Sequence, residues 1–393
     1  MTTFFKSAAA LAAVVAFGIF FFAFQNKKQQ APLSHSPLVA SKSTVVPKIQ
    51  VAILLDVSNS MDGLIDQAKA QLWNMVSVMG NAKCNGATPQ IEIALYEYGS
   101  PRNNEKAGFV KQLSAFTTDL DSLSKNLFSL TTDGGDEYCG QVIFTSINDL
   151  AWDGSDSSYK VIFIAGNEDF LQGSLHYARA CQEAKKRGII VNTIYCGDRM
   201  RGIQEHWNLG AECGGGSFTN INQDAKMEDI PTPYDSSLMV LNERLNGTYI
   251  GYGSMAVAGY SKQAFADASN FKANKSVAMK RIAVKGKKEL YKNSTWDMVD
   301  ASDGDEKFVD KLDPKTLPDS LKNKTRTELK QLVKIKKEER DNLQAQIGNL
   351  SVQREAYLVE ARKKKAGDNQ QTLETETEKL IKRQAKKFNM VID

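Results

Sequence analysis

The stretch Ile49-Gln-Val-Ala-Ile-Leu-Leu-Asp56, followed by Val57-Ser58-Asn59-Ser60, decides the fold of this 393-residue chain. Its first part is a continuous apolar run of strand length, without the alternation that marks a strand with one face in water. Such a run indicates a central strand of a parallel sheet that is covered on both faces. Residues 63–79 then place apolar side chains at helical spacing. The chain is therefore expected to form a strand, a short loop and a helix in this order.

Other apolar runs extend this pattern along the chain. Strands are expected at Gln90–Tyr98, Lys160–Gly166, Ile189–Cys196 and, as a short last one, Gly216–Ile221. A helix is expected from Ser174 to Arg187. Strands that alternate with helices predict an α/β fold, a doubly wound and mostly parallel sheet with helices on both faces. Ligands of such sheets bind beyond the carboxyl ends of the strands, so a site is expected in the loops that follow them.

The loop after the first strand carries the strongest chemical signal. Asp56, Ser58 and Ser60 place a carboxylate and two hydroxyls at alternate positions of a tight loop, where they can converge on one point. Oxygen-only ligands suit a hard divalent cation, Mg²⁺ or Ca²⁺, or also Mn²⁺. Short patterns of this kind arise by chance, but this one lies between an apolar strand and an amphipathic helix. The alternative is a loop in which Ser58 or Ser60 only caps the helix.

On these residues, positions 49 to about 225 resemble the von Willebrand factor type A family. In that family Asp-x-Ser-x-Ser begins a metal-ion-dependent adhesion site, which two further loops complete. The resemblance implies that Asp56, Ser58 and Ser60 form the first metal loop. The second loop of the family supplies a Thr, or an Asp in a Gly-Gly-Asp version. The sequence Gly-Gly-Asp136 matches that version, so Asp136 is carried over, with Thr132 as the runner-up.

The third loop departs from the family pattern. The family usually ends the next strand in Thr-Asp-Gly, whereas this chain reads Ala-Gly-Asn167-Glu168-Asp169. Asn167 or Glu168 is expected to substitute as a metal ligand, since both side chains carry oxygen. A partner's carboxylate commonly fills the open position of the metal in this family, which implies protein binding and not catalysis. A hydrolase that uses the metal to activate water is the enzymatic alternative, and Glu137, Glu168 and Asp169 are the bases it would have.

Composition excludes several other classes of function. Fifty basic and 46 acidic residues leave a net charge of only +4, so nucleic acid is not an expected partner. Three histidines exclude histidine-rich metal sites and leave few ways to build a catalytic dyad. No catalytic residue and no organic cofactor is therefore predicted. Five cysteines cannot all pair within one chain, and no disulfide is assigned.

The N-terminus predicts a membrane anchor. An uncharged apolar run of 18 residues, 7–24, is at the lower limit of what spans a bilayer and lacks a clean cleavage site. Residues 1–25 are therefore expected to be a retained transmembrane helix, with a cleaved signal peptide as the alternative. Residues 26–48 are rich in Pro and Ser and are typical of a linker. Basic residues flank both ends of the run, but we expect a cytoplasmic N-terminus and an exported body, periplasmic or at the surface of a bacterial cell.

The C-terminal part changes character twice. After a type A domain at 49–232, residues 233–318 read as a mixed helix and loop region, and 319–393 as a charged helical tail. Leu343, Ile347, Leu350 and Tyr357 form a short heptad-like stripe, which Arg354 interrupts. The stripe fits a coiled coil that pairs with itself or a partner, or a helix packed on its own domain.

Together these features predict a non-enzymatic, membrane-anchored protein. Its type A domain would bind a divalent cation and recognise a protein ligand through a carboxylate, while the tail helices would support the domain or mediate assembly. The alternative from another class is an envelope scaffold in which the metal site is vestigial and the tail helices make the functional contact.

Overall fold

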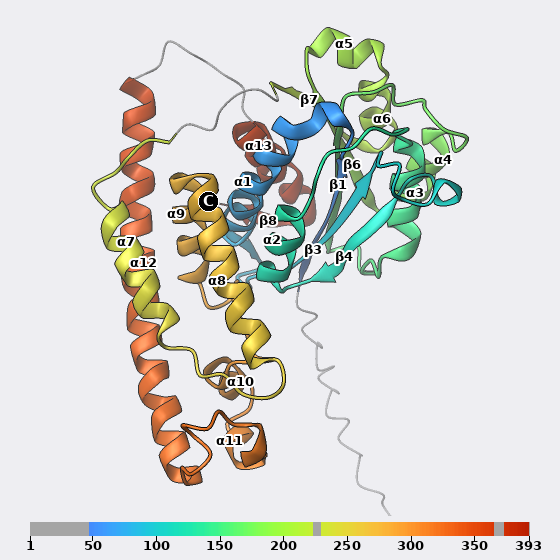
Figure 1. Cartoon of the computed structure of the whole chain (residues 1–393). Helices are drawn as coiled ribbons and strands as arrows, with labels where there is room; N and C mark the ends of the chain where they lie inside the picture. Colours follow the sequence, from blue (N-terminus) through green and yellow to red (C-terminus); the bar gives the residue numbers. More distant parts are fainter. Residues whose placement is uncertain (1–46, 223–228, 365–372, 393) are drawn as a thin grey trace, which may run out of the picture. The chain divides into compact units, whose positions relative to one another are not determined.

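A six-stranded sheet lies at the centre of the computed structural model of this chain, which describes residues 47–222, 229–364 and 373–392. The strand order is β4-β3-β1-β5-β6-β7, and every neighbouring pair is parallel except β3 and β4 (Figure 1). The strands are β1 (Lys48–Asp56), β3 (Gln90–Tyr98), β4 (Lys111–Thr117), β5 (Tyr159–Gly166), β6 (Ile189–Cys196) and β7 (Gly215–Ile221). The apolar run thus forms a central strand, and the predicted mostly parallel α/β fold is confirmed.

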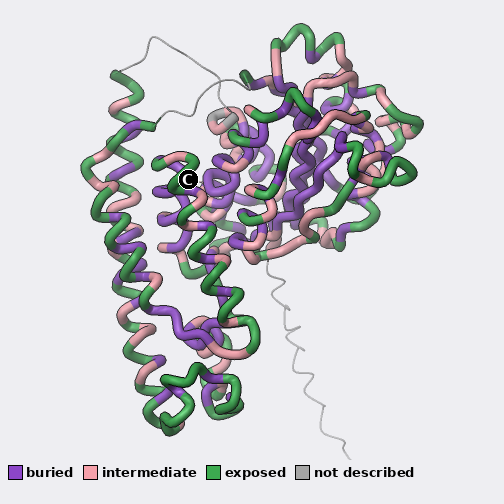
Figure 2. The backbone as a smooth tube through the Cα atoms, in the orientation of Figure 1, coloured by how far each residue is buried: buried purple, intermediate pink, exposed green. Residues whose placement is uncertain are grey.

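Helices cover both faces of this sheet. Alternate residues of β1 point to opposite sides, so Val51 and Ile53 enter one core while Ala52 and Leu54 enter the other. The first core is closed by α1 (Asp62–Met79), α2 (Leu120–Phe128), α9 (Lys275–Lys285) and α13 (Leu373–Ala385). The second is closed by α3 (Cys139–Asp149), α4 (Tyr177–Lys186) and α6 (Trp207–Cys213). Figure 2 shows the strands buried between these two layers.

Some elements differ from the sequence prediction. β4, α2 and α9 were not expected, and the region predicted to mix helix and loop, 233–318, contains the long helix α8 (Ala256–Ala273). The same region also contains α10 (Met298–Gly304). The other helices are α5 (Arg199–Gln204), α7 (Asp235–Asn246), α11 (Phe308–Lys311) and α12 (Arg326–Lys364), with short 3₁₀ turns at Asn59–Met61, Glu105–Ala107, Pro314–Thr316 and Lys386–Phe388.

The C-terminal helices belong to the same compact unit as the sheet, Val45–Asp393. α9 packs against α1, α8 packs against α2, and α12 packs against α7 and α9. Near the end of the chain, β8 (Met390–Ile392) pairs antiparallel with β2 (Ala82–Cys84). These contacts attach the C-terminal elements to the α1 side of the sheet.

The stripe on α12 is covered within this chain. Leu343 and Ile347 are buried in a cluster with side chains of α7 and α9. Arg354, which interrupted the stripe in the sequence, is also buried, and it donates a 2.8 Å hydrogen bond to Asp235. The pattern that favoured a coiled coil is thus explained, at these positions, by packing on the chain's own helices.

A buried charge network joins the C-terminal helices to the sheet domain. Arg281 on α9 forms ion pairs of 2.6 Å with both Asp121 on α2 and Asp267 on α8. Lys285, one turn further on α9, contacts Asp267 at 3.0 Å. The Arg281 guanidinium also lies 4.6 Å from the centre of the Trp73 ring on α1. Because removing one member of a buried pair leaves the other charge uncompensated, this network favours a fixed arrangement of these helices.

The predicted anchor, residues 1–25, and nearly all of the predicted linker, residues 26–46, lie outside the described residues. Across 47–222, 229–364 and 373–392, no helix combines the length and the apolar character that crossing a membrane requires.

Candidate metal site

Asp56 is the last residue of β1, and its side chain is fully buried at the carboxyl edge of the sheet. Its Oδ1 accepts a 2.7 Å hydrogen bond from the backbone N–H of Ser58. Its Oδ2 is buried without any hydrogen-bond partner. Burial, with a smaller contribution from the charge of Glu168, raises the pKa of Asp56 to about 7. An unpaired buried carboxylate oxygen costs free energy, and a bound cation would relieve that cost.

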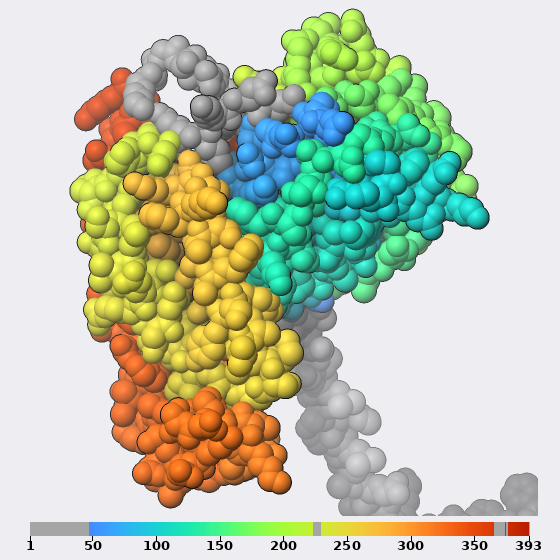
Figure 3. Space-filling model, in the orientation of Figure 1, coloured from blue at the N-terminus to red at the C-terminus, as the bar shows by residue number. Residues whose placement is uncertain are grey.

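The two serines of the first loop follow Asp56; Ser58 is buried, whereas Ser60 reaches the surface. Ser58 Oγ lies 3.4 Å from Ser60 Oγ, and Ser60 is exposed. Ser58 precedes the short 3₁₀ turn that leads into α1, but its side chain makes no capping hydrogen bond there, and α1 has no side-chain cap either. The hydrogen bonds therefore do not support the alternative that these serines only cap the helix. In Figure 3 the start of α1, in blue, lies at the molecular surface.

The second loop is attached to the first, and its two predicted ligands make other hydrogen bonds. The backbone N–H of Asp133 donates a 2.7 Å bond to the Val57 carbonyl. Thr132 Oγ1 donates a 2.5 Å bond to Asp62 on α1. Asp136 is exposed, and its Oδ2 accepts a 3.3 Å bond from the Tyr138 hydroxyl. The hydrogen bonds of Thr132 and Asp136 thus do not join them to the Asp56 carboxylate.

Glu137, the neighbour of Asp136, is the second-loop acid that faces Asp56. A Cβ added at Gly99 would lie 3.0 Å from both Asp56 Oδ1 and Glu137 Cγ, so the two carboxyl groups flank this glycine. Burial, followed by the charges of Asp56, Glu168 and Asp136, raises the pKa of Glu137 to about 8. Sequence reasoning considered Glu137 only as a candidate base. Its position directly after Gly-Gly-Asp was the signal that could have included it in the site.

The third loop brings Asn167 and Glu168 to the same place. Asn167 Nδ2 donates a 3.0 Å bond to Ser60 Oγ, which joins the first and third loops. The charge of Glu168 contributes to the raised pKa of both Asp56 and Glu137, so its carboxylate belongs to the same cluster. Its backbone carbonyl accepts a 2.7 Å bond from Trp207 Nε1, which fixes the loop to α6. Asp169 pairs instead with His206 at 2.9 Å.

Glycines hold the space around the Asp56 carboxylate open. A Cβ at Gly166 would lie 2.9 Å from Asp56 Oδ2 and 2.6 Å from the Tyr98 hydroxyl, and one at Gly135 would overlap the Gly99 carbonyl oxygen. In the described part of the chain, no three His, Cys, Asp or Glu side chains form a metal-binding group by themselves. A cation here would therefore need the serine hydroxyls as well. An orphaned carboxylate oxygen, two hydroxyls and nearby carbonyl or carboxylate oxygens fit a hard divalent cation.

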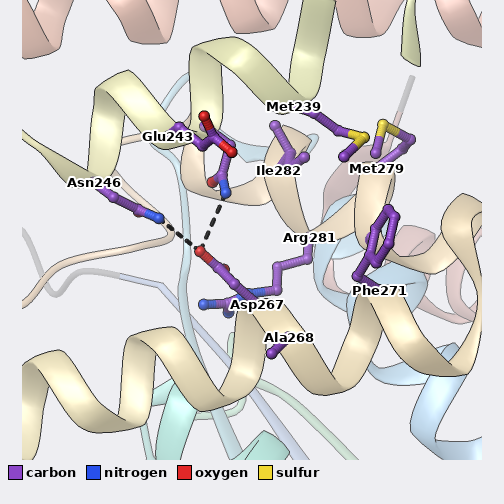
Figure 4. Close-up of a pocket in the computed structure, with 11 residues that line it drawn as sticks. Met239, Glu243, Asn246, Asp267, Ala268, Phe271, Met279, Arg281 and Ile282 are labelled. Atoms are coloured by element: carbon purple, nitrogen blue, oxygen red, sulfur yellow. Dashed lines mark hydrogen bonds and ion pairs between the residues drawn. The ribbon is translucent and has the colours of Figure 1, made fainter. Parts of the chain in front are cut away.

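A separate cavity of about 250 Å³ lies between α7, α8 and α9 (Figure 4). Apolar side chains line part of it, among them Met239, Phe271 and Met279. On its polar side Asp267 accepts hydrogen bonds from Asn242 and Asn246 and pairs with the buried cations of α9. Asp267 is thus already paired with cations of the fold, and the exposed Glu243 is a further acid that lines the cavity.

Comparison with known proteins found similar structures but no similar sequences. No protein-family model matches the chain, and no curated protein is similar to it in sequence. An aerotolerance-related membrane protein from Bacteroides fragilis is 17% identical, over 45% of this chain and 93% of that one, with a TM-score of 0.32. Proximal thread matrix protein 1 from the mussel byssus, with a zinc-occupied adhesion motif, is 11% identical over 44% and 42%, with a TM-score of 0.33.

A von Willebrand factor type A protein from Catenulispora acidiphila is 13% identical over 45% of this chain and 39% of that one, with a TM-score of 0.32. Each likeness covers less than half of the present chain. The von Willebrand factor type A-like fold of residues 48–221 therefore rests on the sheet order, the strand directions and the position of the Asp56 loop.

Proposed function

We propose that this chain is a protein-binding module that depends on a divalent cation and is not an enzyme. Asp56, Ser58 and Ser60 would hold the cation, with Asn167 and Glu168 of the third loop beside them. The observation that carries the proposal is Asp56 Oδ2, which is buried without a hydrogen-bond partner among the described residues, although Oδ1 of the same carboxylate accepts a bond from Ser58.

A partner's carboxylate is the ligand that we propose for this cation. The adjoining surface is accessible, since Asn59 and Ser60 are both exposed. An oxygen-bound Mg²⁺ or Mn²⁺ keeps exchangeable positions, which a carboxylate can fill directly. In the metal-free protein Glu137 is largely protonated near neutral pH, because its pKa is raised to about 8, and it would lose that proton on binding the cation. An acidic side chain of a partner would then complete the site.

Calorimetric titration of Mg²⁺, Mn²⁺ and Ca²⁺ into the full chain tests the metal site. We expect micromolar-to-millimolar binding by the wild type and its loss in Asp56→Asn, which keeps the side-chain shape. Asp136→Asn and Glu137→Gln form a matched pair: the first should bind normally because Asp136 is exposed, and the second should weaken binding at least tenfold. Circular dichroism melts control for folding. Absence of binding by the wild type would refute the proposal.

We also propose that residues 1–25 anchor the protein and that the body is exported. The support is the apolar run at 7–24 and the flanking charges. Protease added to intact spheroplasts should digest the body if it is exported and spare it if it is cytoplasmic. Alkaline carbonate extraction separates the two possibilities for the N-terminus, because a retained anchor stays in the membrane pellet whereas a cleaved signal peptide releases the chain.

Association through the C-terminal helices is a second candidate function with one specific support. Val352 is 72% exposed on α12, and Val359, seven residues further, is 47% exposed. Residues seven apart lie on one side of a helix, so these two form an apolar strip that α7 and α9 do not cover. If the strip mediates assembly, Val352→Glu with Val359→Glu should lower the mass measured by light scattering while metal binding persists. An unchanged mass would exclude it.

A further inference from the structure

Two of the five cysteines are neighbours in space. All five are free thiols, and three of them lie in separate surroundings. Cys84 is beside the Phe388 carbonyl at 4.0 Å, Cys139 is beside the Tyr98 hydroxyl at 3.8 Å, and Cys196 is buried at the end of β6. Cys181 and Cys213 instead lie on the adjacent helices α4 and α6.

The contact between these two helices brings the sulfur atoms together. Cys181 is fully buried, and its Sγ donates a 3.6 Å hydrogen bond to the Gly210 carbonyl on α6. Gly210 lies one turn before Cys213, the last residue of that helix. Burial and, after it, the neighbouring thiol of Cys213 raise the pKa of the Cys181 thiol, which agrees with this proximity. Cys213 is partly exposed, so a reagent can reach the pair from its side.

We propose that Cys181 and Cys213 form a disulfide that joins α4 to α6. The oxidant is a disulfide of a small thiol or of an oxidoreductase. The Cys213 thiolate attacks one oxidant sulfur and releases the other as a thiolate. Cys181, as its thiolate, then attacks the Cys213 sulfur and releases the second half of the oxidant. Two protein thiols lose their protons and are oxidised, and one oxidant disulfide is reduced to two thiols.

The order of the two steps follows from exposure. The thiolate is the reacting form, and an accessible thiol meets the oxidant first. Burial, with the contact to Cys213, raises the pKa of Cys181, while the nearby charge of Lys185 on the same helix acts in the opposite direction. Cys213 is therefore the entry thiol and Cys181 the resolving one. The odd cysteine count then resolves into one pair and three buried thiols, without an intermolecular bond.

The proposed disulfide would act on the element that holds the third loop. α6 begins with Trp207, whose ring N–H donates to the Glu168 carbonyl and whose own carbonyl accepts a 2.7 Å bond from Thr193 on β6. Fixing α6 to α4 would limit motion of this support. The disulfide itself does not depend on metal binding, so failure of one proposal leaves the other intact.

Thiol counting in the full chain tests the proposal. After incubation of the folded protein with oxidised glutathione, thiols titrated in denaturant should fall by two from five. A non-reducing tryptic map should show the peptide 180–185 linked to the peptide 202–226. Cys84→Ser, the matched control, should also lose two thiols, whereas Cys213→Ser should lose none. Retention of all five thiols, or a cross-link between other cysteines or between molecules, would overturn the inference.

The Cys181→Ser variant tests the order of reaction. It should accumulate a stable glutathione adduct on Cys213, visible by intact mass, because the resolving thiol is missing. Cys213→Ser should form no adduct, since Cys181 is buried. An adduct on Cys181, or none on either variant, would contradict the assignment of Cys213 as the entry thiol and, with it, the proposed route to the disulfide.

Discussion

The affinity of the proposed site for its cation should depend steeply on pH between 6 and 8. In the metal-free protein the pKa of Asp56 is raised to about 7, so a proton competes with the cation for the carboxylate. The apparent dissociation constant is multiplied by one plus the ratio of proton concentration to acid constant, a factor of about 11 at pH 6 and about 1.1 at pH 8. Binding should therefore be about tenfold tighter at pH 8, or about 1.4 kcal/mol.

Glu137 determines how large the pH dependence of cation binding can become. Its pKa is raised to about 8, so it is protonated over most of the same range. If the cation also requires the charged form of Glu137, that group contributes a further factor of about 50 between pH 6 and 8. The wild type should then gain up to about 500-fold, whereas Glu137→Gln should show only the tenfold change that belongs to Asp56. The comparison separates the two carboxyl groups.

Titration calorimetry with Mn²⁺ or Mg²⁺ at pH 6, 7 and 8 measures this dependence. Repeating each titration in two non-chelating buffers of different ionisation enthalpy gives the number of protons released. We expect close to one released by Glu137→Gln at pH 6 and almost none at pH 8. The folded-state pKa of Asp56 lies above its ordinary value of 3.8, so the metal-free protein should also lose stability as pH rises from about 4 to 7. Equal affinity at pH 6 and 8 without proton release would refute the reasoning.

Three further predictions concern the framework. Gly135→Ala would place a Cβ on the Gly99 carbonyl oxygen, so we expect at least tenfold weaker metal binding and a lower melting temperature; Gly154→Ala, at a position with open space, should change neither. Arg281→Met leaves the buried Asp121 without its cation and Asp267 with Lys285 alone, and should lower the free energy of unfolding in urea by about 3–5 kcal/mol. Lys288→Met, at an exposed side chain, is its control and should stay within about 0.5 kcal/mol. The Cys181–Cys213 disulfide closes a loop of about 33 residues and should stabilise the oxidised chain by up to about 3.7 kcal/mol over the Cys181→Ser variant. Each prediction is contradicted if the variant and its control show the same metal affinity or the same stability.

Sequence patterns predicted the elements whose environment is uniform. β1, β3 and β6 are largely buried on both faces, and their mostly apolar sequences therefore gave nearly correct bounds. β4 lies at the edge of the sheet with most side chains partly or fully exposed, so its sequence carries little apolar signal. α9 was missed in the sequence for a different reason. It buries Lys280, Arg281 and Lys285, and charges that usually mark a solvent-facing helix there form internal ion pairs.

The candidate site shows the same division between local and tertiary information. Asp56, Ser58 and Ser60 lie in one loop directly after a strand, so their proximity follows from the sequence alone. Which of Asp136 and Glu137 lies beside Asp56 does not follow from the sequence alone. It depends on how the second loop passes Gly99 of the segment after β3, a contact between residues nearly forty positions apart. A shift of one residue in that passage exchanges a buried acid for an exposed one.

The arrangement around Asp56 is better explained by a ligand than by stability. Residues that serve only the fold are usually satisfied, as Arg354 on α12 and Asp235 on α7 are by their mutual hydrogen bond. Here a buried carboxylate oxygen has no partner, and Glu137 and Glu168 add negative charge to its surroundings. Each of these features lowers the stability of the metal-free chain, and the large cores on both faces of the sheet can tolerate that cost. A divalent cation would turn the same three features into favourable contacts at once, and within the described part of the chain no hydrogen-bond partner is found for Asp56 Oδ2.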